Sequence, residues 1–150
     1  MKMRIDFKNT APDTFKLLMD CEKHTHTNGL DPQLVMLVKI RTSQLNGCAH
    51  CIDMHTKEAR KLGEKEERIY ALNAWRESDY FDLKEQAALE FAEAVTLLDL
   101  SSINDDLFDL LKNHFTENEI LELLFTINTM NSWNRVFIAL SHRSTPGIWD

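Results

Sequence analysis

Residues 46–63 read NGCAHCIDMHTKEARKLG, and this stretch combines two helix boundaries with the most reactive side chains of the chain. Gly47 can end one helix and Gly63 the next, because glycine accepts the left-handed conformation common after helix C-termini. Between these glycines, Cys48 and Cys51 form a C-x-x-C motif. The stretch therefore predicts a helix from about Cys48 to the residue before Gly63, with a cysteine pair at its start.

Helix signals recur on both sides of this motif. Asp31-Pro32 offers an N-cap followed by proline at the first helical position. Residues 82–85 (DLKE) and 116–119 (TENE) are capping boxes. The segments predicted to be helical begin near Thr10, Asp31, Cys48, Lys65, Asp82, Asn104 and Thr116. No stretch alternates long enough for a strand, so we expect an all-α, single-domain bundle of about six to seven helices over residues 1–150.

The composition is that of a globular domain without a nucleic-acid surface. The 150 residues are 43% hydrophobic and 27% charged, with a formal net charge of -7 and no basic stripe, whereas phosphate binding requires clustered Lys and Arg. The start, MKMRIDFKNT, lacks the apolar core of a signal peptide, and no window approaches the ~18 apolar residues of a membrane span. We expect a cytoplasmic protein with neither nucleic acid nor membrane as a partner.

Three cysteines, one of them isolated, do not make the disulfide framework of a small secreted domain. Cys21 lies among apolar residues, and we interpret it as a small buried hydrophobic residue. The C-x-x-C pair in a reducing compartment is more typical of a metal site or a redox site.

The spacing of Cys48, Cys51 and His55 brings their side chains to one face of a helix. Each residue of an α-helix turns by about 100°, so positions three, four and seven apart lie close together. The free N–H groups and the positive end of the helix dipole lower the pKa of a thiol at the helix start. The histidine one turn along can accept the thiol proton, so the three residues have the features of an activated dithiol.

Two other interpretations of the motif stay open. A zinc site would use the same three residues but needs a fourth ligand, and no second C-x-x-C or H-x-x-x-H occurs in the chain. We expect His50, between the cysteines, to point elsewhere. A purely structural disulfide would close too small a loop to constrain the unfolded chain much.

The histidines outside the motif do not indicate a site. We interpret His24 and His26 as a solvated helix end and His142 as facing solvent or an interface. The sequence thus indicates no metal and no cofactor.

The stretch from residue 37 to residue 64, LVKIRTSQLNGCAHCIDMHTKEARKLGE, resembles the core of the AhpD-like alkylhydroperoxidases in the carboxymuconolactone decarboxylase superfamily. The similarity continues at 70–77 (YALNAWRE), around 87–95 and at 131–135 (NSWNR), and so covers roughly residues 30–140. The resemblance implies an all-α bundle that assembles into homotrimers or homohexamers. It also implies reduction of hydroperoxides, with Cys48, Cys51 and His55 as the catalytic residues.

One position departs from the family pattern. That pattern has a glutamate twelve residues before the first cysteine, in a proton relay with the histidine, and this position is Met36 here. A thioether neither donates nor accepts a proton in such a relay. We therefore expect either another acid or a shorter relay; Asp53, Glu58 and Glu77 are the nearby acids in the sequence.

The sequence hypothesis is a thiol-dependent peroxidase with an antioxidant role. Cys51 attacks the peroxide and becomes a sulfenic acid, Cys48 condenses with it to a disulfide, and an external thiol, from a protein or a small molecule, restores the pair. The alternatives are a lactone decarboxylase of the same superfamily, which has no use for a dithiol, and a non-catalytic module that senses oxidants or holds zinc.

Residues 120–140 are apolar on more than one helix face, with asparagines interleaved. A helix with so little polar surface is either central in the bundle or buried between subunits. We predict an oligomer, to be measured by light scattering at micromolar concentration. A monomer under these conditions would contradict the prediction.

Overall fold

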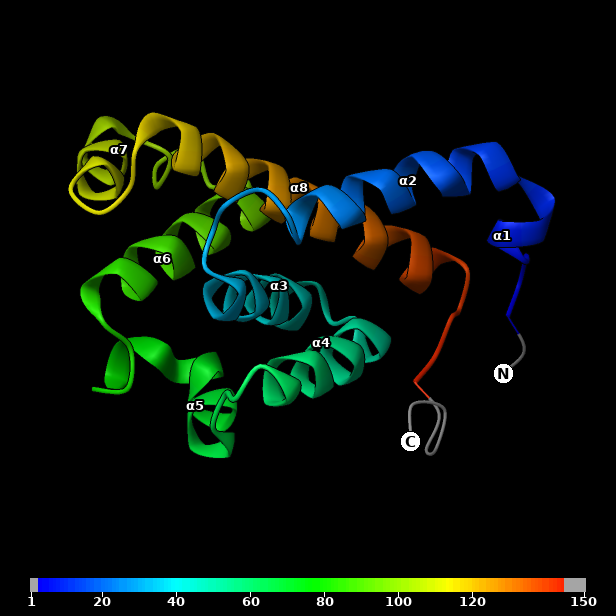
Figure 1. Ribbon diagram of the computed structural model, residues 1–150, viewed down its shortest axis with the longest axis horizontal. Helices are drawn as coiled ribbons and strands as arrows, with labels where there is room; N and C mark the ends of the chain where they lie inside the picture. The colour runs from blue at the N-terminus through cyan, green and yellow to red at the C-terminus, as the bar shows by residue number, and fades with distance from the viewer. Residues whose placement is uncertain (1–2, 145–150) are drawn as a thin grey trace.

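The protein is all-α, as a computed structural model that describes residues 3–144 shows (Figure 1). Those residues contain eight α-helices and one 3-10 helix, η1, and no strand. The elements are α1 (Phe7–Thr10), α2 (Pro12–Thr25), α3 (Pro32–Asn46), α4 (Ala49–Lys61), α5 (Glu66–Ala71), η1 (Leu72–Glu77), α6 (Leu83–Leu97), α7 (Asp105–Lys112) and α8 (Glu117–Ala139). The all-α prediction is confirmed, but the expected number of helices was too low.

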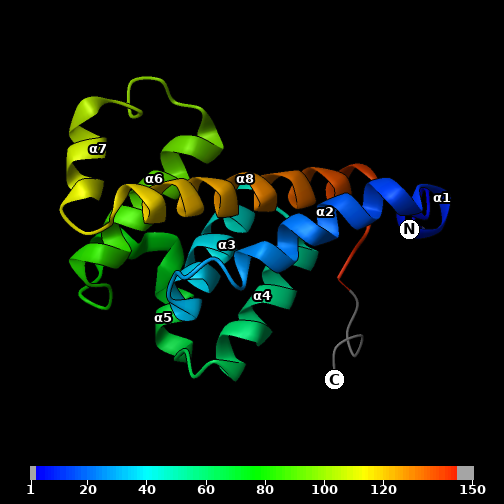
Figure 2. The same ribbon diagram turned by 45° about the horizontal axis from the view of Figure 1, so that its top comes forward.

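Helix α3 is the centre of the bundle. It packs against α4, α6 and α8, and α2 lies along α8 on the side away from α6 (Figures 1 and 2). Leu37, Val38 and Ile40 of α3 have no exposed surface, and Leu123 and Ile127 of α8 are equally buried. This confirms that the apolar helix near the C-terminus is central. Within residues 3–144, no helix combines the length and the apolar character that crossing a bilayer requires.

Both ends of α3 follow from local chemistry. The side chain of Asp31 accepts a hydrogen bond from the backbone N–H of Leu34, and Pro32 occupies the first turn. Gly47 ends the helix with φ 72°, a left-handed conformation that glycine adopts without strain. The next residue, Cys48, caps α4, so the chain turns sharply between two helices.

The segment predicted as a single helix from about Lys65 to Trp75 is divided. An α-helical turn, α5, is followed by η1, and Ala74 has a non-helical conformation with φ -127° and ψ 38°. The apolar residues that suggested one α-helix, Ile69, Leu72 and Trp75, are spaced by three. That spacing fits the three-residue repeat of a 3-10 helix equally well, so the apolar pattern did not distinguish the two helix types.

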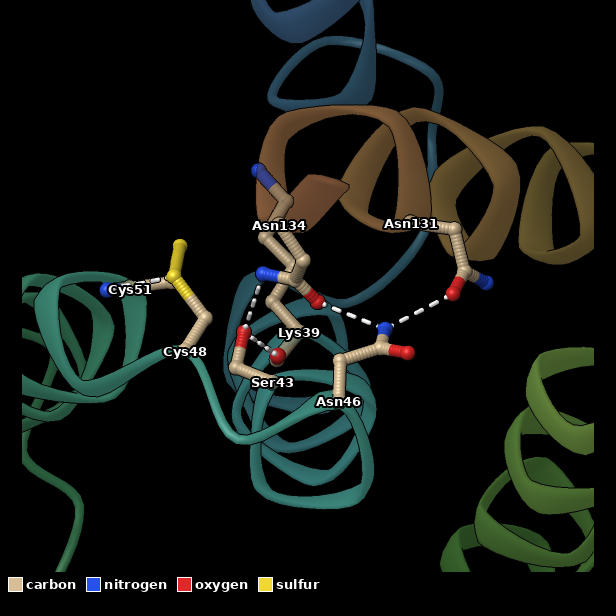
Figure 3. The surroundings of a disulfide bond; sticks show 7 residues. All are labelled: Lys39, Ser43, Asn46, Cys48, Cys51, Asn131 and Asn134. Atoms are coloured by element: carbon tan, nitrogen blue, oxygen red, sulfur yellow. Dashed lines mark hydrogen bonds between the residues drawn. A yellow bond between two sulfur atoms is a disulfide. The ribbon is translucent and has the colours of Figure 1, made fainter. Parts of the chain in front are cut away.

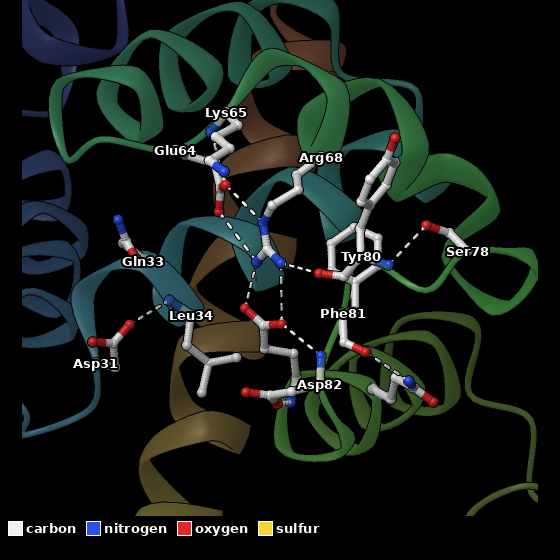
Figure 4. Close-up of polar contacts among 12 residues, drawn as sticks. Asp31, Gln33, Leu34, Glu64, Lys65, Arg68, Ser78, Tyr80, Phe81 and Asp82 are labelled. Atoms are coloured by element: carbon white, nitrogen blue, oxygen red, sulfur yellow. Dashed lines mark hydrogen bonds and ion pairs between the residues drawn. The ribbon is translucent and has the colours of Figure 1, made fainter.

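Arg68 ties this region to the start of α6. Its guanidinium donates to Glu64 and to the backbone carbonyl of Tyr80, and it pairs with Glu85, which is also part of the α6 capping box (Figure 4). The same guanidinium lies 4.9 Å from the ring centre of Phe81. These contacts hold the turn before α6 against α5.

A buried cluster of asparagines joins the end of α3 to α8 (Figure 3). Asn46 donates to the side-chain oxygens of Asn131, at 2.8 Å, and Asn134, at 2.9 Å. Asn134 in turn donates to the hydroxyl of Ser43 at 3.1 Å, and that hydroxyl donates to the carbonyl of Lys39 at 2.7 Å. Because Asn46 is only two residues before Cys48, this cluster positions the turn that leads to the cysteine pair.

Substitution of Asn134 by alanine should destabilise the fold, because it empties a fully buried position and removes one hydrogen-bond partner each of Asn46 and Ser43. The expected loss in the free energy of unfolding is about 2–3 kcal/mol, measured by urea denaturation. The control is Asn128→Ala, an exposed position on the same helix, which should change stability by less than about 0.5 kcal/mol. Equal effects of the two substitutions would contradict a structural role for the cluster.

Candidate active site around the cysteine pair

Cys48 and Cys51 are joined by a disulfide at the N-terminus of α4. Cys48 is the N-cap residue, and its sulfur accepts from the backbone N–H of Cys51 at 3.4 Å (Figure 3). Both residues are buried, at 2% and 0% exposure. The prediction that the pair stands at the start of a helix is confirmed, and the two sulfurs are close enough to be bonded.

His55 lies one turn further along α4 and is 1% exposed. Its Nδ1 is 2.8 Å from Oε2 of Glu58. Burial opposes ionisation of Glu58, but the hydrogen bond and charge of His55 outweigh it and hold the pKa of this carboxyl below its usual range. An ionised carboxylate only accepts hydrogen bonds, so we assign the ring proton to Nδ1. This leaves Nε2 as the atom that can take a proton.

Of the three acids near the motif in sequence, only Glu58 binds His55 in residues 3–144. Asp53 accepts instead from Ser144 at 2.7 Å and pairs with Lys57. Glu77 ends η1, beyond α5. The sequence did not distinguish these three acids, because all of them lie near the motif along the chain. The tertiary structure shows which one contacts His55.

The sulfurs lie in a small apolar cluster with Met130 and Trp133 of α8. Partly buried side chains surround this cluster, among them Phe15, Met19 and Phe137. No hydrogen bond within residues 3–144 joins His55 to either sulfur. Four residues apart on a helix, the side chains of Cys51 and His55 have Cβ atoms roughly 5–6 Å apart, so His55 stands beside the pair and is oriented by Glu58.

Two cavities flank the pair. The first, of about 420 Å³, has Cys48 in its wall together with Gly47, Ala49, His50 and the segment 137–144 after α8; we call it the Cys48 cavity. Cys51 is not in its wall. The two residues therefore differ on this side: Cys48 contributes to the cavity wall, and Cys51 does not.

The second cavity, of about 280 Å³, has His55 and neither cysteine in its wall; we call it the His55 cavity. Most of its wall is apolar, and His55 supplies part of its polar side. Its wall consists of Phe15, Met19, Glu22, Lys23, His26, Met54, His55, Glu58, Trp133 and Phe137. Four of these residues (15, 19, 133 and 137) also belong to the cluster around the sulfurs.

His50, which we predicted to point away from the two cysteines and His55, is buried in the wall of the Cys48 cavity. Its ring packs edge-on against Phe137, with centroids 4.8 Å apart, and against His142, at 4.2 Å. Burial and then the neighbouring His142 lower the pKa of His50 to about 4. His142, which we predicted to face solvent or an interface, is half-buried and belongs to this ring cluster. Residue spacing could not predict that the segment after α8 folds back against His50.

A second group of charges near the site was missed in the sequence. Lys39 of α3 has no exposed surface, and its ammonium donates to Oε1 of Glu22, on α2, at 2.5 Å. His26 has its Nε2 3.2 Å from that oxygen and 3.3 Å from the Lys39 ammonium. Burial opposes the charge of Glu22, but the His26 hydrogen bond and the charge of Lys39 lower the pKa of the carboxyl to about 2.

The signal for this ion pair was present as a lysine inside an apolar run, LVMLVKI, at positions 34–40. A lysine is almost never fully buried unless it is paired, but the sequence does not say which acid pairs with it. The interpretation of His26 as a solvated helix end is therefore incomplete.

Two other predictions near this group have clear outcomes. His24 pairs with Glu122 at the surface at 2.8 Å. Cys21 is half-buried and not bonded, which corrects its assignment as a buried residue.

In the described part of the chain, 3–144, no three or more His, Cys, Asp or Glu side chains are grouped so that they could hold a metal ion. The zinc interpretation of the motif gains no support from the geometry of these residues.

The chain is similar in sequence to a known protein family and to two bacterial proteins. Residues 12–94 match the model of the carboxymuconolactone decarboxylase family. The uncharacterized protein YdfG of Bacillus subtilis (strain 168) is 44% identical over 144 residues, which are 96% of this chain and 98% of YdfG. The uncharacterized protein YnjA of Escherichia coli (strain K12) is 30% identical over 102 residues, 68% of this chain and 56% of YnjA.

Among solved structures, a protein of unknown function from Agrobacterium tumefaciens, ATU0492, provisionally assigned as the antioxidant defence protein AhpD, superposes with a TM-score of 0.92. It is 35% identical, and the match covers 96% of this chain and 99% of that one. The debrominase Bmp8 has the same fold, with a TM-score of 0.82 and 20% identity over 92% of this chain and 74% of Bmp8. The family match over more than half of the residues and the near full-length similarity to YdfG lead to one conclusion: the chain belongs to the carboxymuconolactone decarboxylase family, as an AhpD-like member.

Proposed function

We propose that the protein is a thiol-dependent peroxidase that reduces hydroperoxides through Cys48 and Cys51 in an antioxidant role. The observation that carries the proposal is the bonded cysteine pair at the start of α4, with a buried histidine one turn along whose Nδ1 is held by Glu58. A helix N-terminus favours a thiolate, and an imidazole with a free nitrogen accepts the proton that the thiol loses.

The oxidative half of the reaction uses both cysteines. The S–H bond of Cys51 breaks, its electron pair stays on sulfur and its proton goes to His55. The thiolate attacks the terminal oxygen of the hydroperoxide, the O–O bond breaks, and the alcohol leaves with that proton, so that Cys51 becomes a sulfenic acid. The sulfur of Cys48 then displaces water from this sulfenic acid, and the product is the disulfide.

The reductive half begins at Cys48. An external thiolate must reach a sulfur along the S–S axis, and Cys48 is the cysteine that contributes to the wall of a cavity. Attack at Cys48 releases Cys51 as the thiolate and forms a mixed disulfide with the donor. A second thiol of the donor resolves it and restores the reduced pair. We place this cycle in the cytoplasm, where thiol donors are available, and in a homotrimer or homohexamer.

The lactone decarboxylase alternative makes no use of the cysteine pair, so the disulfide favours redox chemistry over it. The fold alone does not choose the substrate, because a debrominase shares it. Consumption of a hydroperoxide is therefore the property to measure.

The Cys51→Ser variant should lose peroxide consumption, because it removes the attacking sulfur. The rate of hydroperoxide loss, measured with an excess of dithiothreitol, should fall to the uncatalysed level. Full turnover by this variant would reverse the assignment of the two cysteines.

Two further variants complete the test. In an assay without a thiol reductant, Cys48→Ser should consume about one equivalent of peroxide and stop, with a sulfenic acid on Cys51 that dimedone captures and mass spectrometry locates. Cys21→Ser is the matched control, since Cys21 is half-buried and outside the site, and it should keep the full rate. If peroxide leaves the thiols of the unaltered protein intact, the peroxidase proposal is wrong.

A further inference from the structure

Three buried polar atoms without hydrogen-bond partners in the described residues belong to side chains that line the same cavity, the His55 cavity. They are Nε2 of His55, on α4, Oε2 of Glu22, on α2, and Nε1 of Trp133, on α8. His55 and Glu22 are the titratable pair among them, and the other polar atom of each is occupied: Nδ1 of His55 by Glu58, and Oε1 of Glu22 by Lys39. A buried polar atom without a partner is costly, so this pair calls for a functional explanation.

Charged and titratable groups face His55 from three helices. Its own helix, α4, contributes Glu58, His50 and the cysteine pair. From α2 come Glu22, His26 and Lys23, and from α3 comes Lys39. The fourth neighbouring helix, α8, contributes to the cavity only the uncharged rings at 133 and 137.

The fixed charges of this group do not balance. Glu22 and Glu58 carry two negative charges, and Lys39 carries one positive charge, which leaves one negative charge in excess. Lys23 is exposed, so water screens it. A proton on His26 would put a second positive charge 3.3 Å from the Lys39 ammonium. A proton on His55 has no such neighbour and neutralises the group.

We propose that Glu22 is a positioning residue for the dithiol: its negative charge offsets that of the buried Lys39, so that one negative charge stays in excess beside His55 and allows His55 to accept the proton of Cys51. The S–H bond of Cys51 breaks, the electron pair remains on sulfur, and the proton moves to His55. The residue at position 36, on the buried face of α3, is a methionine and takes no part in this exchange. The proposal rests on the proposed function for its biological meaning, but the proton transfer is measurable without any peroxide.

The test is the pH dependence of iodoacetamide alkylation of the reduced protein, followed for Cys48 and Cys51 by mass spectrometry, because only the thiolate reacts. In Glu22→Gln the group is neutral without a proton on His55. The midpoint of the alkylation profile should therefore rise by about one pH unit, which makes alkylation about tenfold slower below the midpoint. In the double variant Glu22→Gln/Lys39→Met one negative charge is again in excess, and the midpoint should return to within about 0.3 unit of the original value.

The matched control is Glu122→Gln, which removes a carboxylate from the surface pair with His24 and should leave the midpoint unchanged. Circular dichroism establishes that each variant is folded. Glu22→Gln leaves Lys39 unpaired and could therefore fail to fold. In that case two other variants carry the test: Glu22→Asp, which keeps the negative charge, and the double variant Glu22→Gln/Lys39→Met. Both should have the midpoint of the original protein.

A folded Glu22→Gln with an unchanged midpoint would overturn the proposal. So would a double variant with the raised midpoint of the single variant, or a shifted midpoint in Glu22→Asp. Failure of the peroxidase proposal would give a different result. The alkylation midpoint of Glu22→Gln would rise as expected, but the unaltered protein would not consume hydroperoxide.

Discussion

The turn between α3 and α4 determines where both sulfurs lie. Gly47 ends α3 in a left-handed conformation, and the next residue, Cys48, already caps α4. Most residues with a β-carbon adopt this conformation only at a cost in free energy, whereas glycine does so freely. The asparagine cluster fixes the preceding residue, Asn46, to α8. The cysteine pair thus stands on a rigid corner, with its backbone position set from two sides, as a reactive pair requires.

Burial gives the two cysteines different environments although they are only three residues apart. Cys48 is at the end of the helix, in the wall of a cavity, and Cys51 is inside the apolar cluster of α8 side chains. An asymmetric pair can divide its work between a sulfur that meets the reducing partner and one that meets the histidine. Apolar surroundings disfavour a thiolate, and in the proposed mechanism the charges near His55 offset that effect.

Those charges also bear on the stability of the bundle. Lys39 lies in the centre of the fold, and a buried ammonium is tolerated only with a close partner. Glu22 supplies that partner from α2, so the ion pair fixes one face of α2 to α3. A buried ion pair is seldom the most stabilising solution, since a well-packed apolar pair is often equally stable. Its presence beside the His55 cavity is explained by the proposed charge balance, in which Glu22 offsets the buried Lys39.

The sequence by itself determined the helical class, most helix starts and the place of the cysteine pair. Capping residues such as Asp31, Asp82 and Thr116 act on backbone groups within the next turn, so their effect is readable locally. The same reasoning placed His55 one turn from Cys51. It did not separate α5 from the 3-10 turn after it, because apolar residues spaced by three fit both.

Only the tertiary structure decided which side chains from distant segments meet at the site. Glu22 and Lys39 are seventeen residues apart, and His142 comes almost a hundred residues after His50. These contacts depend on how α2 and the segment after α8 lie across α3 and α4, which no local pattern encodes. One short motif therefore determined the residues of the cysteine pair and their position on a helix, whereas helix packing determined their charge environment and their access to the surface.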